Sequence, residues 1–224
     1  MIRAYSELYL MDAQRGLSWM LHFAVNDMGM DIDEYFDLFL NSGIAELYGT
    51  GDASYVAGKS GIEVVYAVLE RMGISCDLSI EPTFPLDRTP EYWTGWALSY
   101  YQWFTGLSYG KIVEILPVSS IRDMYHPYHE MDIRHFVLEL NRLYMEKYPL
   151  TNLRYRRDNQ GFSQKQLAVL SGVPLRSIQQ YEQRQMNINK AQGEYLYMLA
   201  KALYCNVGDL LERVPAATEE IERS

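Results

Sequence analysis

The chain has 224 residues, a formal net charge of −9 and 48% hydrophobic residues, a balance that is normal for a globular protein and excludes a disordered one. No apolar run approaches the roughly 18 residues of a membrane-spanning helix, and the first residues lack the basic and apolar regions of a signal peptide. We therefore expect a cytoplasmic protein with no membrane partner. The two cysteines, Cys76 and Cys205, lie too far apart in sequence to indicate a disulfide framework.

Residues 1–73 are predicted to form an N-terminal helical domain. Apolar residues recur at helical spacing in its first helix, at Leu17, Met20, Leu21, Ala24 and Val25. Further helices are expected over Ile32–Leu40 and Ile62–Met72. Each of these two begins with an N-cap residue followed three positions later by an acid: Asp31 with Glu34, and Ser60 with Glu63.

The segment before the helix expected at Ile62–Met72 has a glycine, a lysine and a serine in a row. Residues 53–60, Ala-Ser-Tyr-Val-Ala-Gly-Lys-Ser, resemble a relaxed phosphate-binding loop with alanine in place of the first glycine. A helix follows, as such a loop requires, but no buried strand precedes it. A helix N-terminus capped by Ser60 is therefore the preferred interpretation, and we expect no nucleotide cofactor.

Residues 74–150 are predicted to be a linker followed by an aromatic-rich helical segment. Pro82 and Pro85 indicate an extended linker from Ile74 to Arg88, and Thr89 before Pro90 is typical of an N-cap with proline at the first helical position. The helix then carries an aromatic cluster: Trp93, Trp96, Tyr100, Tyr101, Trp103 and Phe104. Most of these share one face, which favours core packing. Because Tyr92 and Tyr101 lie off that face, a partner-binding groove is the alternative.

The rest of this segment offers no catalytic or metal-binding set. A further helix is expected from Asp132 to Lys147, ending before Pro149. Three histidines lie close together, at His126, His129 and His135, but Pro127 intervenes and no cysteine or second acidic group completes a metal site. No nucleophile, base and acid stand out together either. We expect no enzyme, no metal and no cofactor.

Charge is distributed unevenly along the chain. Residues 1–150 have a net charge of −11 and residues 191–224 a net charge of −3, whereas residues 151–190 contain seven Lys or Arg and two Asp or Glu. DNA affinity depends on local contacts with phosphate groups, so this basic island matters more than the total charge. The island is therefore the place to look for a nucleic-acid-binding site.

Within residues 151–213, the stretch from Gln164 to Gln183 has the features of two helices that meet at a steep angle. Ala168 supplies the small residue that their contact requires, and Gly172 supplies the positive φ of a tight turn. The inner face of the second helix is apolar, at Val173, Ile178 and Tyr181. Its outer face is polar, as entry into a major groove requires, at Arg176, Gln179 and Gln180.

The flanking sequence completes a domain of five short helices. Ser163 and Gln166 form a capping box before the first of the two helices. A basic helix precedes it, with Leu153, Arg154, Arg156 and Arg157. Asn189 and Gln192 are expected to start a fourth helix that runs through Leu203. Asn206 and Asp209 start a short fifth one, and residues 214–224 form a flexible tail. The predicted fold class is all-α: an N-terminal helical region plus this C-terminal five-helix domain.

Two stretches of this domain resemble a known family. "LRYRRDNQGFSQKQLAVLSGVPLRSIQQYEQ" and "LAKALYCNVGDLLE" resemble the Xre-type regulators, the Cro/phage-repressor class of helix-turn-helix proteins, over residues 152–213. The resemblance implies binding of double-stranded DNA by a recognition helix at Pro174–Glu182. It also implies base-edge contacts from Leu175, Arg176 and Gln180 and a phosphate contact from Gln164. The full set of expected DNA-binding residues is Gln164, Lys165, Leu175, Arg176, Ser177, Gln179, Gln180 and Arg184.

Two residues depart from the family pattern. Pro174 occupies the position of a capping Ser or Thr, which puts the contact at Leu175 in doubt. Tyr204 replaces the usual glycine after the fourth helix, at some cost in backbone strain. A helix-turn-helix used only for protein contact is the alternative, and the polar outer face of the second helix argues against it.

Residues 1–150 resemble antitoxins of bacterial toxin–antitoxin modules. In "DIDEYFDLFLNSGIAELY" and "EYWTGWALSYYQWF" they are similar to regulators that accompany ADP-ribosyltransferase-like toxins. The two resemblances together imply a repressor of its own operon, homodimeric on an inverted-repeat operator, whose residues 1–150 bind a protein toxin. The alternative is a regulator that is no antitoxin, whose N-terminal region senses a ligand or mediates oligomerisation.

Overall fold

A computed structural model of the chain describes residues 3–214, so all of the expected tail except Val214 lies outside the described residues. The all-α fold is confirmed, since residues 3–214 contain helices and turns but no strand. Across the same range, every helix is too short or too polar to cross a bilayer. The described residues divide into two compact units, one before Tyr144 and one from Tyr144 onward.

From Arg3 onward, the N-terminal unit contains ten α-helices, of which the last continues into the second unit. In chain order they are α1 (Leu10–His22), α2 (Ile32–Asn41), α3 (Ile44–Gly49), α4 (Ala53–Val56), α5 (Gly61–Arg71), α6 (Pro90–Thr105), α7 (Tyr109–Ile115), α8 (Val118–Asp123), α9 (Tyr125–Tyr128) and α10 (Ile133–Lys147). A short 3-10 helix, η1 (Glu7–Tyr9), precedes α1, and a π-helical turn, η2 (Phe23–Asp27), extends it.

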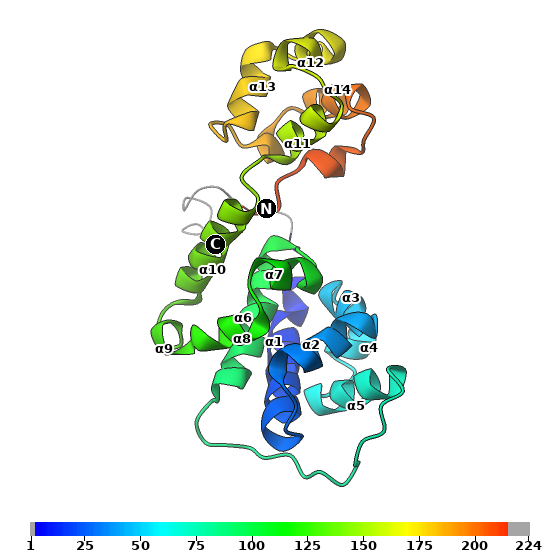
Figure 1. Cartoon of the computed structure of the whole chain (residues 1–224), viewed down its shortest axis with the longest axis vertical. Coiled ribbons are helices and arrows are strands. Elements are labelled where there is room, and N and C mark those ends of the chain that lie inside the picture. Colours follow the sequence, from blue (N-terminus) through cyan, green and yellow to red (C-terminus); the bar gives the residue numbers. More distant parts are fainter. Residues whose placement is uncertain (1–2, 215–224) are drawn as a thin grey trace. The chain divides into compact units, whose positions relative to one another are not determined.

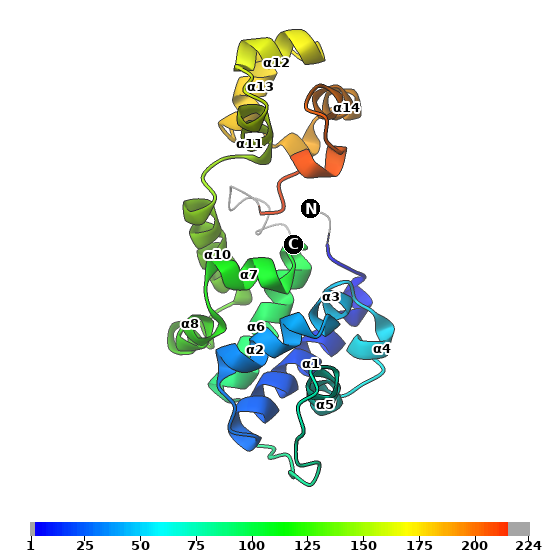
Figure 2. The same cartoon turned by 45° about the vertical axis from the view of Figure 1, so that its right-hand side comes forward.

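Helices α1 and α6 pack along each other at the centre of this unit (Figure 1 and Figure 2). They approach closely at Gly95, where a Cβ atom would overlap the backbone carbonyl of Leu17. Helix α5 packs on α1 in the same way at Gly61, whose Cβ would overlap the carbonyl of Gly16. Residues from the predicted 1–73 and 74–150 segments therefore share one core.

The aromatic cluster of α6 lies largely inside this core. Trp93, Trp103 and Phe104 are buried, as core packing predicts, whereas Trp96 and Tyr100 of the same cluster are half-buried. Tyr101, expected off the buried face, is also fully buried, and its hydroxyl donates a hydrogen bond to Asn141 Oδ1 at 3.0 Å. The alternative that Tyr101 lines a partner-binding groove is thus wrong, because α6 is covered on more than one side.

The predicted helix starts of this unit are confirmed. Asp31 accepts hydrogen bonds from the backbone of the first turn of α2, and Ser60 forms a complete capping box with Glu63 before α5. Thr89 caps α6, with Pro90 at the first helical position. Sequence periodicity missed α3, α4, α7, α8 and α9, which have four to seven residues and are too short to show a repeating apolar face.

As far as Val214, the C-terminal unit contains four further α-helices and two 3-10 turns. They are α11 (Asn152–Asn159), α12 (Gln164–Ser171), α13 (Leu175–Glu182), η3 (Ile188–Lys190), α14 (Gly193–Ala202) and η4 (Val207–Leu210). The expected fifth helix is thus the 3-10 turn η4, at whose start the backbone N–H of Asn206 donates to Asp209 Oδ2 at 2.9 Å. One core holds these elements together, with Leu153, Leu167, Ile178, Leu199 and Leu203 among its members.

Candidate DNA-binding surface

Local sequence fixes the junction between α12 and α13. Ser163 and Gln166 form the predicted capping box at the start of α12. At its end Gly172 adopts φ +74° and its N–H bonds the carbonyl of Ala168 at 2.9 Å, so the predicted left-handed turn is confirmed. A Cβ at Gly172 would also lie 3.1 Å from the Met198 side chain. Backbone conformation and packing therefore both favour glycine here.

The rotation of α13 about its own axis is set by its buried face. Ile178 and Tyr181 of α13 lie in the core of the unit, as predicted, and so does Val173, which stands in the turn before α13 and not on the helix. Arg176 is exposed as a result, and Gln179 and Gln180 are half-buried. Because Arg176 and Gln180 are four residues apart, their side chains project from the same side of the helix.

The structure places the other expected DNA-binding residues around this face. Lys165 is exposed on α12, and Leu175 and Ser177 are half-buried in the first turn of α13. Within residues 3–214 neither Lys165 nor Arg176 has an ion-pair partner, so both charges are available to a ligand.

Pro174 changes how α13 begins. The helix starts at Leu175 with Pro174 as its N-cap, and no side chain caps its first turn. The carbonyl of Pro174 accepts hydrogen bonds from the backbone N–H groups of Ser177 and Ile178, at 2.9 and 3.2 Å. The first turn therefore forms although the usual Ser or Thr cap is missing.

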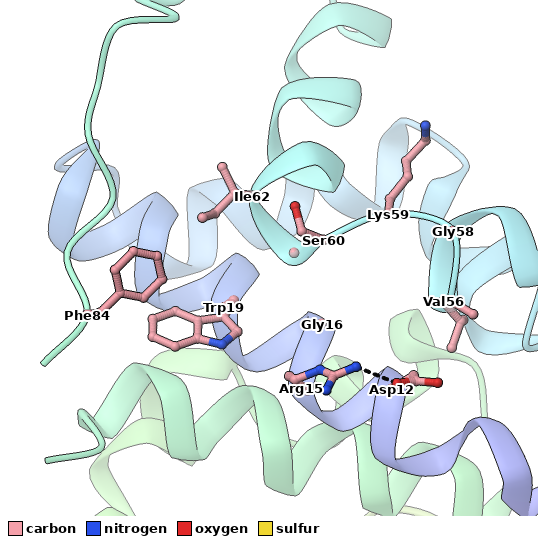
Figure 3. A pocket seen from close by; sticks show the side chains of 12 residues that line it. Asp12, Arg15, Gly16, Trp19, Val56, Gly58, Lys59, Ser60, Ile62 and Phe84 are labelled. Carbon is pink, nitrogen blue, oxygen red and sulfur yellow. Dashed lines mark hydrogen bonds and ion pairs between the residues drawn. The ribbon is translucent and has the colours of Figure 1, made fainter. Parts of the chain in front are cut away.

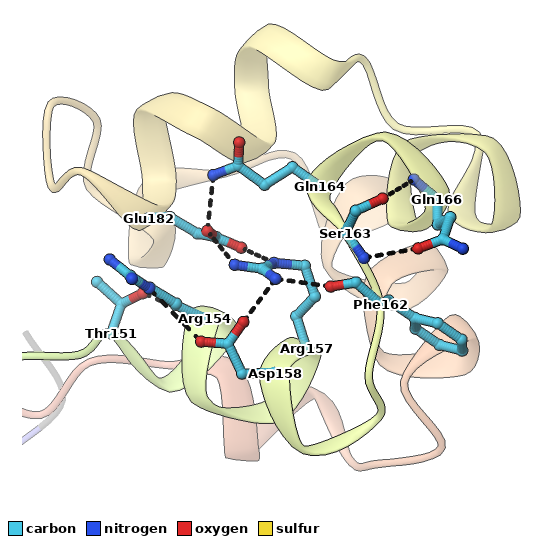
Figure 4. A network of polar contacts seen from close by, with 9 residues as sticks. All are labelled: Thr151, Arg154, Arg157, Asp158, Phe162, Ser163, Gln164, Gln166 and Glu182. Carbon is cyan, nitrogen blue, oxygen red and sulfur yellow. Dashed lines mark hydrogen bonds and ion pairs between the residues drawn. The ribbon is translucent and has the colours of Figure 1, made fainter.

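A buried ion pair joins α11 to the end of α13, a role that the sequence did not reveal. Arg157 Nε and Nη2 donate to the two carboxylate oxygens of Glu182 at 2.6 and 2.9 Å, and the two side chains are only 10% and 2% exposed (Figure 4). Arg157 Nη1 also donates to Asp158 Oδ1 and Phe162 O, both at 2.6 Å. The hydrogen bonds that Arg157 donates to Glu182 raise the pKa of Arg157 above its usual range.

Gln164 belongs to the same network. Its Nε2 atom donates to Glu182 Oε2 at 2.8 Å, which holds the side chain over the end of α13 (Figure 4). An amide nitrogen carries two hydrogens, so the predicted phosphate contact would have to use the other one. The bond to Glu182 would then orient Gln164 for that contact.

The basic island contains fewer free charges than its formal count indicates. Besides the buried Arg157, Arg156 lies 3.4 Å from Asp209 and Arg154 lies 3.5 Å from Asp158. Arg184, predicted to bind DNA, donates to Pro149 O at 2.8 Å and lies 3.8 Å from Glu212, with its side chain only 21% exposed. Because of these two contacts, the Arg184 guanidinium is less available to DNA than the sequence predicts.

Comparison with known proteins agrees with this geometry for the C-terminal unit. Residues 153–210 match a family model described as helix-turn-helix. No curated protein and no solved structure matches the chain. The family match supports DNA binding in transcription regulation as the function of the C-terminal unit.

Proposed function

We propose that the C-terminal unit is a sequence-specific reader of double-stranded DNA that represses transcription, including that of its own operon. The observation that carries the proposal is the exposed face of α13, where Arg176 stands without an ion-pair partner among residues 3–214 and Gln180 lies one turn away. Arg and Gln are the side chains that form paired hydrogen bonds with guanine and adenine edges in the major groove.

The rest of the surface fits phosphate contacts. Lys165 is exposed at the start of α12, on the helix that crosses the DNA backbone in a helix-turn-helix complex. Gln164 lies beside it, oriented by Glu182. In this proposal Arg176, Gln179 and Gln180 contact the base edges, and Gln164 and Lys165 contact phosphates and so position the protein on the duplex.

One unit of this size covers a half-site. Reading an inverted repeat requires a two-fold dimer with its recognition helices about one helical turn of DNA apart. We therefore propose that the protein binds as a homodimer. Light scattering of the full chain, alone and with operator DNA, would measure this directly. A single monomer on an operator without symmetry would contradict it.

The experiment that tests DNA reading starts from selection of a preferred site out of random duplexes. Binding of Arg176→Ala to that site should weaken by roughly 1–3 kcal/mol relative to the unchanged protein, with a much smaller loss on random DNA. Arg154→Gln is the matched control, since it removes a cation that belongs to α11 and not to the recognition helix. Equal losses on both duplexes for Arg176→Ala would reduce its role to phosphate contact. Failure to select any site would end the proposal.

A second candidate function, inhibition of a protein toxin by residues 1–150, has an observation of its own. The stretch between α5 and α6 exposes large apolar side chains, with Leu78 and Leu86 76% and 104% exposed. Such side chains in a long segment without helix are typical of binding segments. With a net charge of −11, residues 1–150 would suit a basic partner. Co-expression with the product of the adjacent gene tests this: a harmless neighbour that does not co-purify would remove the antitoxin role.

A further inference from the structure

A cavity lies between α1 and the start of α5, on the segment that resembles a phosphate-binding loop. Its volume is about 440 Å³, within the range of about 300–1,000 Å³ that small-molecule sites occupy. Its walls come from the face of α1 between Asp12 and Trp19, from residues 56–62, and from Phe84 of the segment before α6. No strand precedes residues 53–60, which form α4 and a connection, so this is not a nucleotide-binding loop of the usual type.

One end of the cavity is aromatic. Figure 3 shows Trp19 and Phe84 side by side, and their ring centroids are 5.0 Å apart with an interplanar angle of 69°. Trp19 is also held edge-on by His22 and Tyr92, at 5.3 and 5.1 Å. The indole is therefore fixed in place before any ligand arrives, which lowers the entropic cost of binding.

Phe84 is held at the cavity although it is 66% exposed. The preceding residue, Thr83, anchors it: Thr83 Oγ1 donates to Asp27 Oδ1 at 2.6 Å and lies 3.3 Å from His22 Nε2. The backbone N–H of Thr83 also donates to Asp27 Oδ2 at 3.2 Å. An exposed aromatic side chain on a tethered segment provides a platform on which a planar ring can stack.

The other end of the cavity is charged. Arg15 lies there beside Asp12, with Nη2 and Oδ1 2.6 Å apart, and its side chain is 68% exposed (Figure 3). Asp12 is its only polar partner within residues 3–214, so most of the five N–H donors of the guanidinium stay available. Lys59 also belongs to the lining, but its ammonium group extends away from Trp19 and Arg15 in Figure 3.

From this arrangement we propose that the cavity binds a small molecule with a planar ring and one anionic group. The ring stacks on one of the two aromatic side chains, Trp19 or Phe84, and meets the other edge-on, because the planes of the two rings are 69° apart. A carboxylate or phosphate binds the free edge of the Arg15 guanidinium, whose planar fork matches both anions. Aromatic carboxylates and nucleotides share this chemistry. The site lies wholly in the N-terminal unit, so the proposal goes beyond DNA binding and does not depend on it. It would make that unit a ligand sensor.

The test is calorimetric titration of the full chain with two pairs of probes. Indole-3-acetate is compared with the uncharged indole-3-acetamide, and adenosine monophosphate with adenosine. We expect one of the two anionic probes, indole-3-acetate or adenosine monophosphate, to saturate at one molecule per chain. That probe should bind at least about tenfold more tightly than its uncharged counterpart. The pair that responds identifies the ligand as a carboxylate or a nucleotide.

Three variants locate the site. Arg15→Gln should weaken the responding probe at least about tenfold, and Phe84→Ala about three- to tenfold. Lys59→Gln is the matched control, a cation on the same rim that points elsewhere, and should change affinity less than about twofold. All three side chains are largely exposed, and circular dichroism confirms folding before titration. The proposal is overturned by no binding of either anion at millimolar concentration, by equal binding of the uncharged probes, or by equal losses in Arg15→Gln and Lys59→Gln.

Discussion

The contacts that stabilise each of the two units internally differ in how far apart in the sequence the bonded residues lie. In the C-terminal unit the features that position α13 lie close in sequence: the capping box at Ser163, the left-handed Gly172 and the N-cap Pro174. In the N-terminal unit the decisive contacts join residues far apart in the chain. Tyr48 donates to the carbonyl of Ala13 at 2.9 Å, and Gln102 donates to that of Gly49, also at 2.9 Å.

This difference explains why the function of one unit could be inferred from sequence and that of the other could not. A helix-turn-helix exposes its reading face through the local pattern of polar and apolar residues on one short helix. The cavity of the N-terminal unit is assembled from three separate segments, and its Phe84 wall is set by a tether to Asp27. We therefore expect a substitution that destabilises one unit to leave the unfolding of the other unchanged.

The largest effect is expected from the buried ion pair of the C-terminal unit. Glu182→Leu would leave Arg157 Nε and Nη2 buried without an acceptor, with only Nη1 still bonded to Asp158 and Phe162, and loss of one member of such a pair costs about 3–5 kcal/mol of unfolding free energy. All four tryptophans precede Tyr144, so tryptophan fluorescence reports on the N-terminal unit alone, whereas circular dichroism reports on both. Urea titration should therefore show an earlier dichroism transition and an unchanged fluorescence transition.

Two further variants check the cause. Arg154→Gln removes the half-exposed pair with Asp158 and should cost no more than about 1 kcal/mol. Combining Arg157→Met with Glu182→Leu replaces the pair with apolar groups and should recover most of the lost stability. A loss below about 1 kcal/mol for Glu182→Leu would mean that the ion pair does not hold α11 to α13. A matching shift in fluorescence would mean that the units do not unfold separately.

An intermediate effect is expected at the crossing of α1 and α6. A methyl group at Gly95 would overlap the Leu17 carbonyl, so Gly95→Ala should destabilise the N-terminal unit by about 1–3 kcal/mol. The fluorescence transition in urea should move to lower concentration while DNA binding by the folded protein is unchanged. Gly110→Ala is the control, since a Cβ there meets only Leu40 Cδ2 at 4.0 Å, and its effect should stay within about 0.5 kcal/mol. Equal effects of the two alanines would show that helix contact is not the cause.

Sequence reasoning succeeded where one short segment determines the outcome. The all-α fold, the capping residues Asp31, Ser60 and Thr89, and the turn at Gly172 were predicted and are confirmed. The inner face of the recognition helix is confirmed as well, because apolar periodicity encodes it directly. The contacts of Arg176 and Gln180 with bases stay predictions.

What sequence could not supply is the pairing of residues across helices. Arg157 was predicted to be one of several cations on a basic helix, and only the fold brings it to Glu182, 25 positions away. Tyr101 looked like an interface residue because a single amphipathic face was assumed for α6, whereas Asn141 covers that side. A charge or an aromatic ring has no fixed role until its neighbours are known, and those neighbours come from other elements.

The smallest predicted effect concerns Tyr204, which stands where the helix-turn-helix pattern has glycine. Tyr204 has φ +54°, a left-handed conformation that costs an L-residue about 1–2 kcal/mol, and its side chain is 85% exposed. Tyr204→Gly removes this strain, while the greater freedom of glycine in the unfolded chain offsets about 0.5–1 kcal/mol. We expect a net stabilisation of up to about 1 kcal/mol in the dichroism transition, with the fluorescence transition unchanged.

Arg184 provides the contrast that tests this explanation. It has nearly the same backbone conformation, φ +55°, but its guanidinium donates to Pro149 O at 2.8 Å and lies near Glu212. Arg184→Gly relieves the same strain and loses those contacts, so it should destabilise the unit where Tyr204→Gly stabilises it. If both glycines raised the unfolding midpoint, the contacts of Arg184 would contribute nothing to stability. If both lowered it, backbone strain at Tyr204 would be too small to matter.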